Sequence, residues 1–252
     1  MENSFVNQDV LDGVSTITFS NPPHNALPST LLLKLEIEIN LAAENSFVQV
    51  IVLQSAGDRT FCAGASFDEL ITIETEAQGA LFFSGFAKVI NAMRKCCKFI
   101  ICKVQGKTVG GGVGLAAAAD YCLATQYASI KLSELSIGIG PFVIEPAVSR
   151  KIGISAMSEL TVNAEQFYSA TWAENKGLYA QVFETQSELN AEVDTLVNKL
   201  RTYNPEAVKA MKTVMWHNTN HWDKLLLERA KISGTLVLSN FTKEVLSKYK
   251  TV

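Results

Sequence analysis

Short apolar runs rich in β-branched residues alternate with longer helical patterns along the first half of the chain. The runs VQVIVLQS (48–55) and FIICKV (99–104) have the length and composition of buried strands, and VSTITF (14–19) alternates as a half-buried strand does. Strands that alternate with helices usually pair in parallel, so the sequence predicts an α/β fold. The other expected elements are helices over 30–44 and 78–97 and strands at YCLAT (121–125) and SIKL (129–132).

Two serines lie where helix N-caps are expected. Ser29 directly precedes the helical run 30–44, and its hydroxyl is of the kind that accepts a hydrogen bond from the first turn. Ser66 and Glu69 have the S-x-x-E spacing of a capping box, in which each side chain bonds the other residue's backbone N–H.

From about residue 187 the chain changes to consecutive amphipathic helical patterns, over 187–203, 205–217 and 223–250. A helical tail this long has wide apolar faces that need a surface to cover, and another subunit can supply part of it. We expect a core over residues 1–190 and a C-terminal helical oligomerisation subdomain over residues 191–252.

Composition excludes several classes of protein. The net charge is −3 and no long basic block occurs, so we expect no nucleic-acid partner. No apolar run approaches the roughly 18–20 residues of a membrane span, and the polar start does not resemble a signal peptide. The five cysteines are an odd number and lie mostly in apolar runs, which favours reduced thiols in the cytosol. We therefore expect a cytoplasmic protein without a membrane partner.

The segment GKTVGGGVGLAAAAD (106–120) places a run of glycines between a strand and an alanine-rich helix. Gly112-x-Gly114-x-x-Ala117, with Glu134 about twenty residues on, matches the spacing of a dinucleotide-binding turn. That turn usually begins its domain, however, and here about a hundred residues come first. A second explanation is that glycines permit close packing of the helix on its neighbours.

A third explanation accounts for more of the pattern. A helix that begins with glycines presents unpaired backbone N–H groups, without side chains in front of them, at the positive end of its dipole. Such N–H groups form half of an oxyanion hole. The loop FCAGAS (61–66) also follows a buried strand and contains a bending glycine, so it is a candidate for the other half.

The sequence resembles the enoyl-CoA hydratase/isomerase (crotonase) superfamily in four segments. FCAGASFDEL and VQGKTVGGGVGLAAAAD are similar to its two signature segments, and NPPHNAL and SELSIGIGPFVIEPAVSRKIG are similar to two others, in family order and at family spacing. GGGVGLA is closest in motif to bacterial methylglutaconyl-CoA hydratase-like members. The resemblance implies a spiral of β-β-α units with a helical C-terminus, assembled as a homotrimer or a dimer of trimers.

The resemblance also implies a site for an acyl-CoA substrate. The backbone N–H groups of Ala65 and Gly111 would bind the thioester carbonyl, and the Glu134 carboxylate would move a proton at the acyl carbons. CoA is part of the substrate, so neither a separate cofactor nor a metal is implied. Contacts with the substrate are implied for His24, Ala26, Cys62, Ala63, Gly64, Ser66, Phe67, Gly110, Pro141 and Lys248, with Lys250 as a further basic residue near the end.

The sequence departs from the family pattern at two positions. Many hydratases of the family use two glutamates, and Gly114 stands where they carry the second glutamate. Ser66 stands where the family usually has aspartate. Three functions follow as alternatives: hydration of a 2-enoyl-CoA, Δ3–Δ2 isomerisation by one glutamate, and acyl-CoA binding without catalysis. Glu145 is a candidate for the missing carboxylate, or an acidic residue that interacts with a helix dipole.

A pair of histidines and one cysteine are further candidates for chemistry. His217 and His221 stand four apart, as metal ligands on one helix face do, but no third ligand is evident. Cys62 lies beside the implied site, but no histidine–carboxylate arrangement marks it as a nucleophile.

Overall fold

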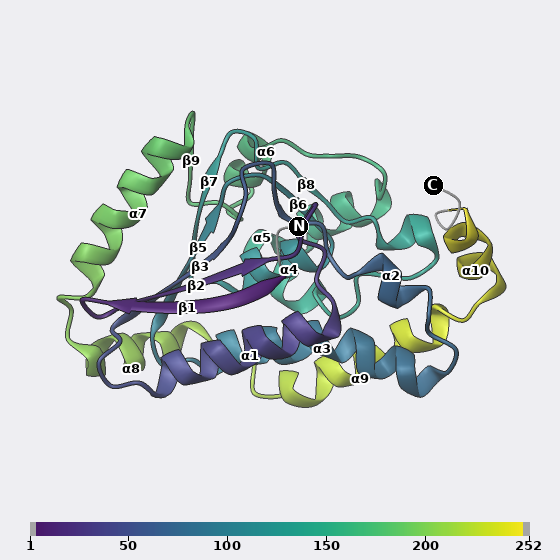
Figure 1. Cartoon of the computed structure of the whole chain (residues 1–252), viewed down its shortest axis with the longest axis horizontal. Coiled ribbons are helices and arrows are strands. Elements are labelled where there is room, and N and C mark those ends of the chain that lie inside the picture. The colour runs from purple at the N-terminus through teal and green to yellow at the C-terminus, as the bar shows by residue number, and fades with distance from the viewer. Residues whose placement is uncertain (1–3, 249–252) are drawn as a thin grey trace.

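The computed structural model describes residues 4–248, in which short strands alternate with helices up to about residue 183 and only helices follow (Figure 1). The strands are β1 (Phe5–Leu11), β2 (Val14–Ser20), β3 (Val50–Ser55), β4 (Thr60–Cys62), β5 (Phe99–Val104), β6 (Lys107–Val109), β7 (Tyr121–Thr125), β8 (Ile130–Lys131) and β9 (Gln181–Phe183).

These strands form two sheets. The larger has the order β1-β2-β3-β5-β7-β9, and the smaller has the order β4-β6-β8. The β1–β2 pair is antiparallel, whereas the pairs that join β2, β3, β5, β7 and β9 are parallel. The predicted α/β class and parallel pairing are therefore confirmed. The seven-residue strand β1 and the three-residue strands β4, β6 and β9 are additions that the periodicity did not predict.

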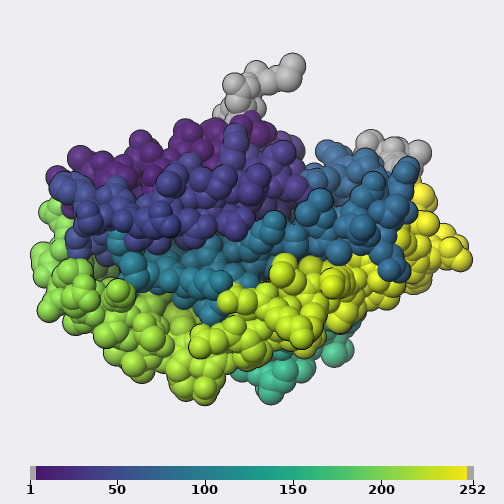
Figure 2. Space-filling view, turned by 90° about the horizontal axis from the view of Figure 1, so that it is seen from below, coloured from purple at the N-terminus to yellow at the C-terminus, as the bar shows by residue number. Residues whose placement is uncertain are grey.

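The helices lie around the sheets (Figure 1). Helices α1, α3 and α9 run side by side along one face of the molecule, which Figure 2 shows from below. Among the helices that the structure describes, none is long and apolar enough to cross a membrane. The helices are α1 (Ser29–Glu44), α2 (Phe67–Leu70), α3 (Glu76–Lys95), α4 (Gly111–Ala118), the 3₁₀ helix η1 (Glu134–Ile137), α5 (Glu145–Val162), α6 (Ala170–Asn175), α7 (Gln186–Leu200), α8 (Pro205–Met215), α9 (Trp222–Leu236) and α10 (Asn240–Ser247).

The first two helix caps differ from the prediction. Ser29 is the first residue of α1 rather than its cap; Pro28 takes that place without a side-chain hydrogen bond. The Glu69 carboxylate replaces the expected cap, because it accepts hydrogen bonds from the Ser29 N–H (2.7 Å) and hydroxyl (2.5 Å). Ser66 does cap α2, accepting from the Glu69 N–H, but the Glu69 side chain does not return to Ser66. The predicted capping box is therefore only half formed, and Glu69 joins two helices instead.

The helical tail is confirmed as helical, but its last predicted pattern divides into α9 and α10. Ser239 caps α10 by accepting a hydrogen bond from the Thr242 N–H at 3.2 Å, which starts a new helix after a turn. Helix α10 then packs on η1, where a Cβ on Gly138 would lie 2.4 Å from the Thr242 hydroxyl oxygen. The division of the chain at residue 190 and the role of the tail in oligomerisation stay predictions.

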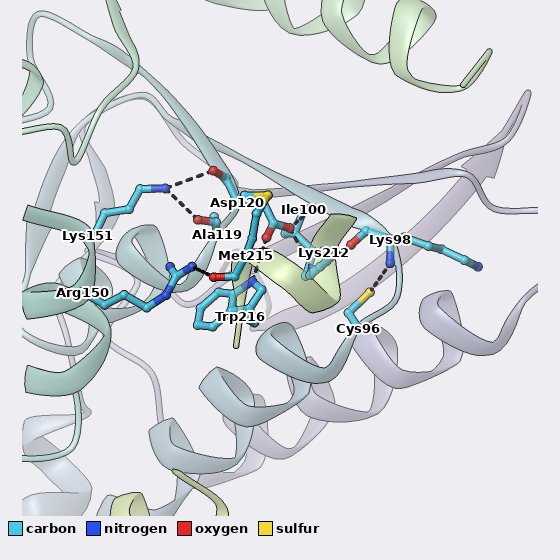
Figure 3. A network of polar contacts seen from close by, with 10 residues as sticks. All are labelled: Cys96, Lys98, Ile100, Ala119, Asp120, Arg150, Lys151, Lys212, Met215 and Trp216. Atoms are coloured by element: carbon cyan, nitrogen blue, oxygen red, sulfur yellow. Dashed lines mark hydrogen bonds and ion pairs between the residues drawn. The ribbon is translucent and has the colours of Figure 1, made fainter. Parts of the chain in front are cut away.

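A buried ion pair ties the C-terminal end of α4 to α8 (Figure 3). The Asp120 carboxylate lies 2.8 Å from the Lys212 ammonium, and the two side chains are 3% and 2% exposed. The same carboxylate accepts hydrogen bonds from the Ile100 N–H (2.8 Å) and the Trp216 indole N–H (3.0 Å). Lys212 also donates to the Lys98 carbonyl at 2.7 Å. Helix α4 is thus held at the end opposite its glycines.

Candidate functional site

A pocket lies where the 63–67 loop, the first turn of α4 and η1 come together with parts of α3 and α9. Its lining is mostly apolar, and the one carboxyl group in it belongs to Glu134. Several residues expected at the substrate line this pocket: Ala63, Gly64, Ala65, Phe67, Gly110, Gly111, Glu134 and Pro141.

The backbone of Ala65 is oriented by a single parallel bridge to Leu27. In this bridge Leu27 donates its N–H to the Gly64 carbonyl (2.7 Å), and the Ser66 N–H donates to the Leu27 carbonyl (3.0 Å). Because neighbouring peptide groups of an extended chain face opposite sides, the Ala65 N–H points away from Leu27. It has no hydrogen-bond acceptor among residues 4–248. Ala65 therefore presents a free N–H at the pocket that it lines.

The second N–H belongs to Gly111, the first residue of α4. Its cap, Gly110, has φ 54° and ψ −119°, a conformation that residues with a side chain rarely adopt. The first N–H groups of a helix have no partner within the helix. The two loops are close, because a Cβ on Gly64 would lie 3.7 Å from the Gly111 nitrogen. The unpaired N–H of Gly111 is thus adjacent to the loop that carries Ala65.

Each glycine of the run lies against a different neighbour, so close packing accounts for the absence of side chains. A Cβ on Gly111 would lie 2.3 Å from the Phe86 ring, and a Cβ on Gly112 would lie 2.7 Å from the Cys62 Cβ. Contacts below 3.0 Å would force the neighbours to move. Close packing therefore accounts for the glycines, which let the helix approach the pocket wall. The oxyanion explanation stays a prediction.

Glu134 begins η1, and its carboxyl group lies against the glycine turn. Its Oε1 would be 2.9 Å from a Cβ on Gly110. The Oε2 atom is buried and has no hydrogen-bond partner within residues 4–248. Burial raises the pKa of this carboxyl group from 4.5 to about 7, against a smaller lowering by its own backbone N–H. A carboxyl group with such a pKa is populated in both protonation states near neutral pH, as a proton-transfer group must be.

The raised pKa predicts that Glu134 destabilises the folded protein above neutral pH. The folded state binds this proton more tightly than the unfolded state, so stability is lost as the pH rises from about 4.5 through about 7. At pH 8 we expect the free energy of unfolding of the Glu134→Gln chain to be about 3 kcal/mol higher than that of the original chain. At pH 4 we expect the two chains to be equally stable. Urea unfolding at both pH values measures this difference. An equal increase in the free energy of unfolding at both pH values would contradict burial as the cause of the raised Glu134 pKa.

Ile144 occupies the space beside Gly114, where many family members carry a second glutamate. A Cβ on Gly114 would lie 2.4 Å from the Ile144 Cγ2 and 3.6 Å from the Ile90 Cδ1. Glu145, considered as a substitute carboxylate, does not line the pocket. It begins α5, where it accepts a hydrogen bond from the Ser149 hydroxyl (2.7 Å). Among the described residues Glu134 is thus the only carboxylate in this pocket. Ile144 lies in the PFVIE segment (141–145), which the sequence predicts to line the acyl pocket, and it does line it.

The remaining residues expected at the substrate do not line this pocket: His24, Ala26, Cys62, Ser66 and Lys248. The His24 and Ala26 carbonyls accept hydrogen bonds from the Ala63 N–H and the Asn21 side chain. Asn25, which the sequence did not single out, holds this segment: its side chain donates to the Ala56 and Thr60 carbonyls, each at 2.9 Å.

Cys62 and Lys248 lie outside the pocket lining. Cys62 is fully buried, and burial raises the pKa of its thiol to about 12, so it is an uncharged packing residue rather than a nucleophile. Lys248 is exposed at the C-terminal end of α10, and Lys250 falls outside the described residues. Within residues 4–248, no group of three histidine, cysteine, aspartate or glutamate side chains is placed to bind a metal ion.

Comparison with known proteins finds a match to the enoyl-CoA hydratase/isomerase family model over residues 9–244. A peroxisomal Δ(3,5)-Δ(2,4)-dienoyl-CoA isomerase of Arabidopsis thaliana is 28% identical over 215 residues, which cover 79% of this chain and 76% of the isomerase. A short-chain-enoyl-CoA hydratase of Clostridium acetobutylicum is 30% identical over 201 residues, with the same two coverages of 79% and 76%.

The fold has close counterparts among solved structures. An enoyl-CoA hydratase from Bacillus halodurans superposes with a TM-score of 0.90 at 18% identity, covering 97% of this chain and all of the other. At this identity the likeness concerns the fold, and it confirms the crotonase-like architecture expected from the sequence.

Proposed function

The chain belongs to the enoyl-CoA hydratase/isomerase family, and from that premise we propose that it hydrates a 2-enoyl-CoA through a stabilised thioester enolate. The observation that carries this proposal is the pocket itself. One buried carboxyl group, that of Glu134, lies against the glycine turn, inside an otherwise largely apolar lining. In this turn the Gly110 N–H donates to the Lys131 carbonyl (2.9 Å), whereas the Gly111 N–H has no acceptor among residues 4–248.

In the proposed reaction the Ala65 and Gly111 N–H groups donate to the thioester oxygen. The Glu134 carboxylate takes a proton from water while the water oxygen forms a bond to C3. The electrons of the C2–C3 double bond move toward the thioester, whose oxygen becomes an enolate. Glu134 then returns the proton to C2, so one water is added and the carboxylate is restored.

The two N–H groups favour this step because they interact more strongly with the enolate oxygen than with the neutral carbonyl. They belong to the backbone of two packed segments, so they need no reorganisation as the charge develops. Removal of one such donor in other enzymes costs about 3–4 kcal/mol of transition-state stabilisation. The short side chains at positions 63–65 and 110–111 leave room for the oxygen to approach.

Δ3–Δ2 isomerisation is the second candidate, and Ile144 is the observation that favours it. Ile144 fills the space beside Gly114, so no second carboxylate is available to hold a water molecule opposite Glu134. Moving a proton from C2 to C4, or the reverse, requires only one carboxyl group and the same enolate. An apolar wall beside that carboxyl group suits this reaction.

Two substrates separate these candidates. With crotonyl-CoA, loss of the absorbance of the conjugated thioester indicates hydration; with 3-hexenoyl-CoA, a gain of that absorbance indicates isomerisation. We expect loss with crotonyl-CoA. A gain with 3-hexenoyl-CoA and no reaction of crotonyl-CoA would favour the second candidate. Tight acyl-CoA binding without turnover of either would favour the third alternative, a binding protein without catalysis, and would refute both reactions.

The assembly and location of the protein follow as further parts of the proposal. We infer a homotrimer or a dimer of trimers from the resemblance of the helical tail, and a cytoplasmic location from the cysteine content.

A further inference from the structure

The pocket contains a buried hydroxyl group for which the reaction above has no use. Ser233, on α9, lines the pocket and is only 1% exposed. No hydrogen bond within the described part of the chain uses the Ser233 hydroxyl, although helical serines commonly bond a carbonyl of the preceding turn. Among the described residues Glu134 Oε2 is the only side-chain polar atom that is sealed from solvent without a partner, so the Ser233 Oγ still borders the open pocket. A buried hydroxyl without a partner is unfavourable unless a water or a ligand supplies one.

The surrounding helices hold Ser233 in place. Next to it, Gly234 contacts α3 backbone to backbone, because a Cβ on Gly79 would lie 2.6 Å from the Gly234 Cα. One turn earlier on the same face, the Arg229 guanidinium lies 3.9 Å from the Glu145 carboxylate. Ser233 is therefore fixed between α3 and the segment that precedes Glu145.

These contacts place Ser233 beside the walls of the pocket that Phe83 and Ile144 form. Gly79 is one turn before Phe83 on α3, and the segment that ends at Ile144 forms the adjoining wall. Both Phe83 and Ile144 belong to the apolar part of the lining, whereas the N–H groups for the thioester come from the 63–65 and 110–111 segments. The Ser233 hydroxyl is thus a polar group in the region available to the acyl chain.

We propose that Ser233 selects acyl-CoA thioesters whose acyl group carries a hydrogen-bonding oxygen, such as a hydroxyl, oxo or carboxyl group; this rests on the proposed acyl-CoA site. An alkyl chain would displace water from the hydroxyl and leave it unpaired, whereas an oxygen atom in reach would pair with it. Sites built to hydrogen-bond a substrate group discriminate strongly against analogues that lack the group.

Calorimetric binding of acyl-CoAs of equal chain length tests this proposal. The ligands are butyryl-CoA and its counterparts with oxygen at C3 or C4: 3-hydroxybutyryl-, acetoacetyl-, 4-hydroxybutyryl- and succinyl-CoA. The measurements use a Glu134→Gln background so that no ligand is turned over. We expect at least one oxygen-bearing ligand to bind about tenfold more tightly than butyryl-CoA. Adding Ser233→Ala should abolish that preference and leave butyryl-CoA binding unchanged or tighter.

Alanine is a strong helix former, so the Ser233→Ala chain is expected to fold, which circular dichroism verifies. Ser84→Ala is the matched control: Ser84 is a buried helical serine outside this pocket, and its hydroxyl donates to the Leu81 carbonyl at 2.6 Å. It should keep the preference. A preference that survives Ser233→Ala, or equal weakening of all ligands including butyryl-CoA, overturns the role of Ser233. Failure of every acyl-CoA to bind overturns the proposed function as well.

Discussion

Replacing Glu134 with glutamine is expected to lower kcat by about 10²- to 10⁴-fold, the usual contribution of a positioned acid–base group. Glutamine keeps the size of the side chain but cannot accept and return the proton. Because the two N–H donors and the pocket lining are unchanged, KM should change far less than kcat. Steady-state kinetics on the substrate identified with crotonyl-CoA or 3-hexenoyl-CoA measures both constants.

Glu145→Gln is the control for this substitution. It removes a carboxylate next to Ile144 in sequence, but one that bonds Ser149 and does not line the pocket. Its kcat should stay close to that of the original chain. Undiminished turnover of the Glu134→Gln enzyme would remove Glu134 from the mechanism. A large loss of kcat in the Glu145→Gln enzyme would show that Glu145 takes part in catalysis, against its position outside the pocket.

The Asp120→Asn substitution is expected to lower the free energy of unfolding by about 3–5 kcal/mol, because it leaves the buried Lys212 ammonium without a countercharge. Asp120 is the only carboxylate among the residues drawn in Figure 3, where Lys151 and Arg150 also lie nearby. Without Asp120, three cationic side chains would remain around the end of α4. Urea unfolding at neutral pH gives the difference in free energy.

Two further variants make this result specific. Adding Lys212→Met should restore part of the stability, because both charges are then absent. The exposed Lys224–Glu228 pair provides the control: its atoms are 3.5 Å apart and its side chains are 87% and 53% exposed. Glu228→Gln should cost no more than about 0.5 kcal/mol. If Asp120→Asn also lowered the free energy of unfolding by no more than about 0.5 kcal/mol, the ion pair would not hold α8 to α4.

Local periodicity was sufficient to predict the central strands, because runs such as 99–104 are buried on both faces and carry few polar residues. It did not predict β1, since Phe5–Leu11 is an edge strand with mostly exposed side chains and a mixed polar sequence. The prediction that Ser29 caps the first helix was wrong, because the Ser29 N–H at the start of that helix bonds the side chain of Glu69, forty residues away. No local pattern carries such a contact.

The same distinction applies to the site. The glycine run and the FCAGAS loop could be assigned to one pocket because their motifs are local and resemble those of a family. The pairing of Gly114 with Ile144, and the approach of Ser233 to the pocket, depend on how separate helices pack against one another. The missing second carboxylate was visible in the sequence, but the residue that replaces it became evident only in three dimensions.

The most direct test of the central claim is a crystal structure of the protein with butyryl-CoA bound, in which the thioester oxygen is located. The account predicts that the nitrogens of Ala65 and Gly111 both lie about 2.7–3.2 Å from that oxygen, with their hydrogens directed at it. An oxygen bound elsewhere, or within reach of only one of these two nitrogens, would contradict it.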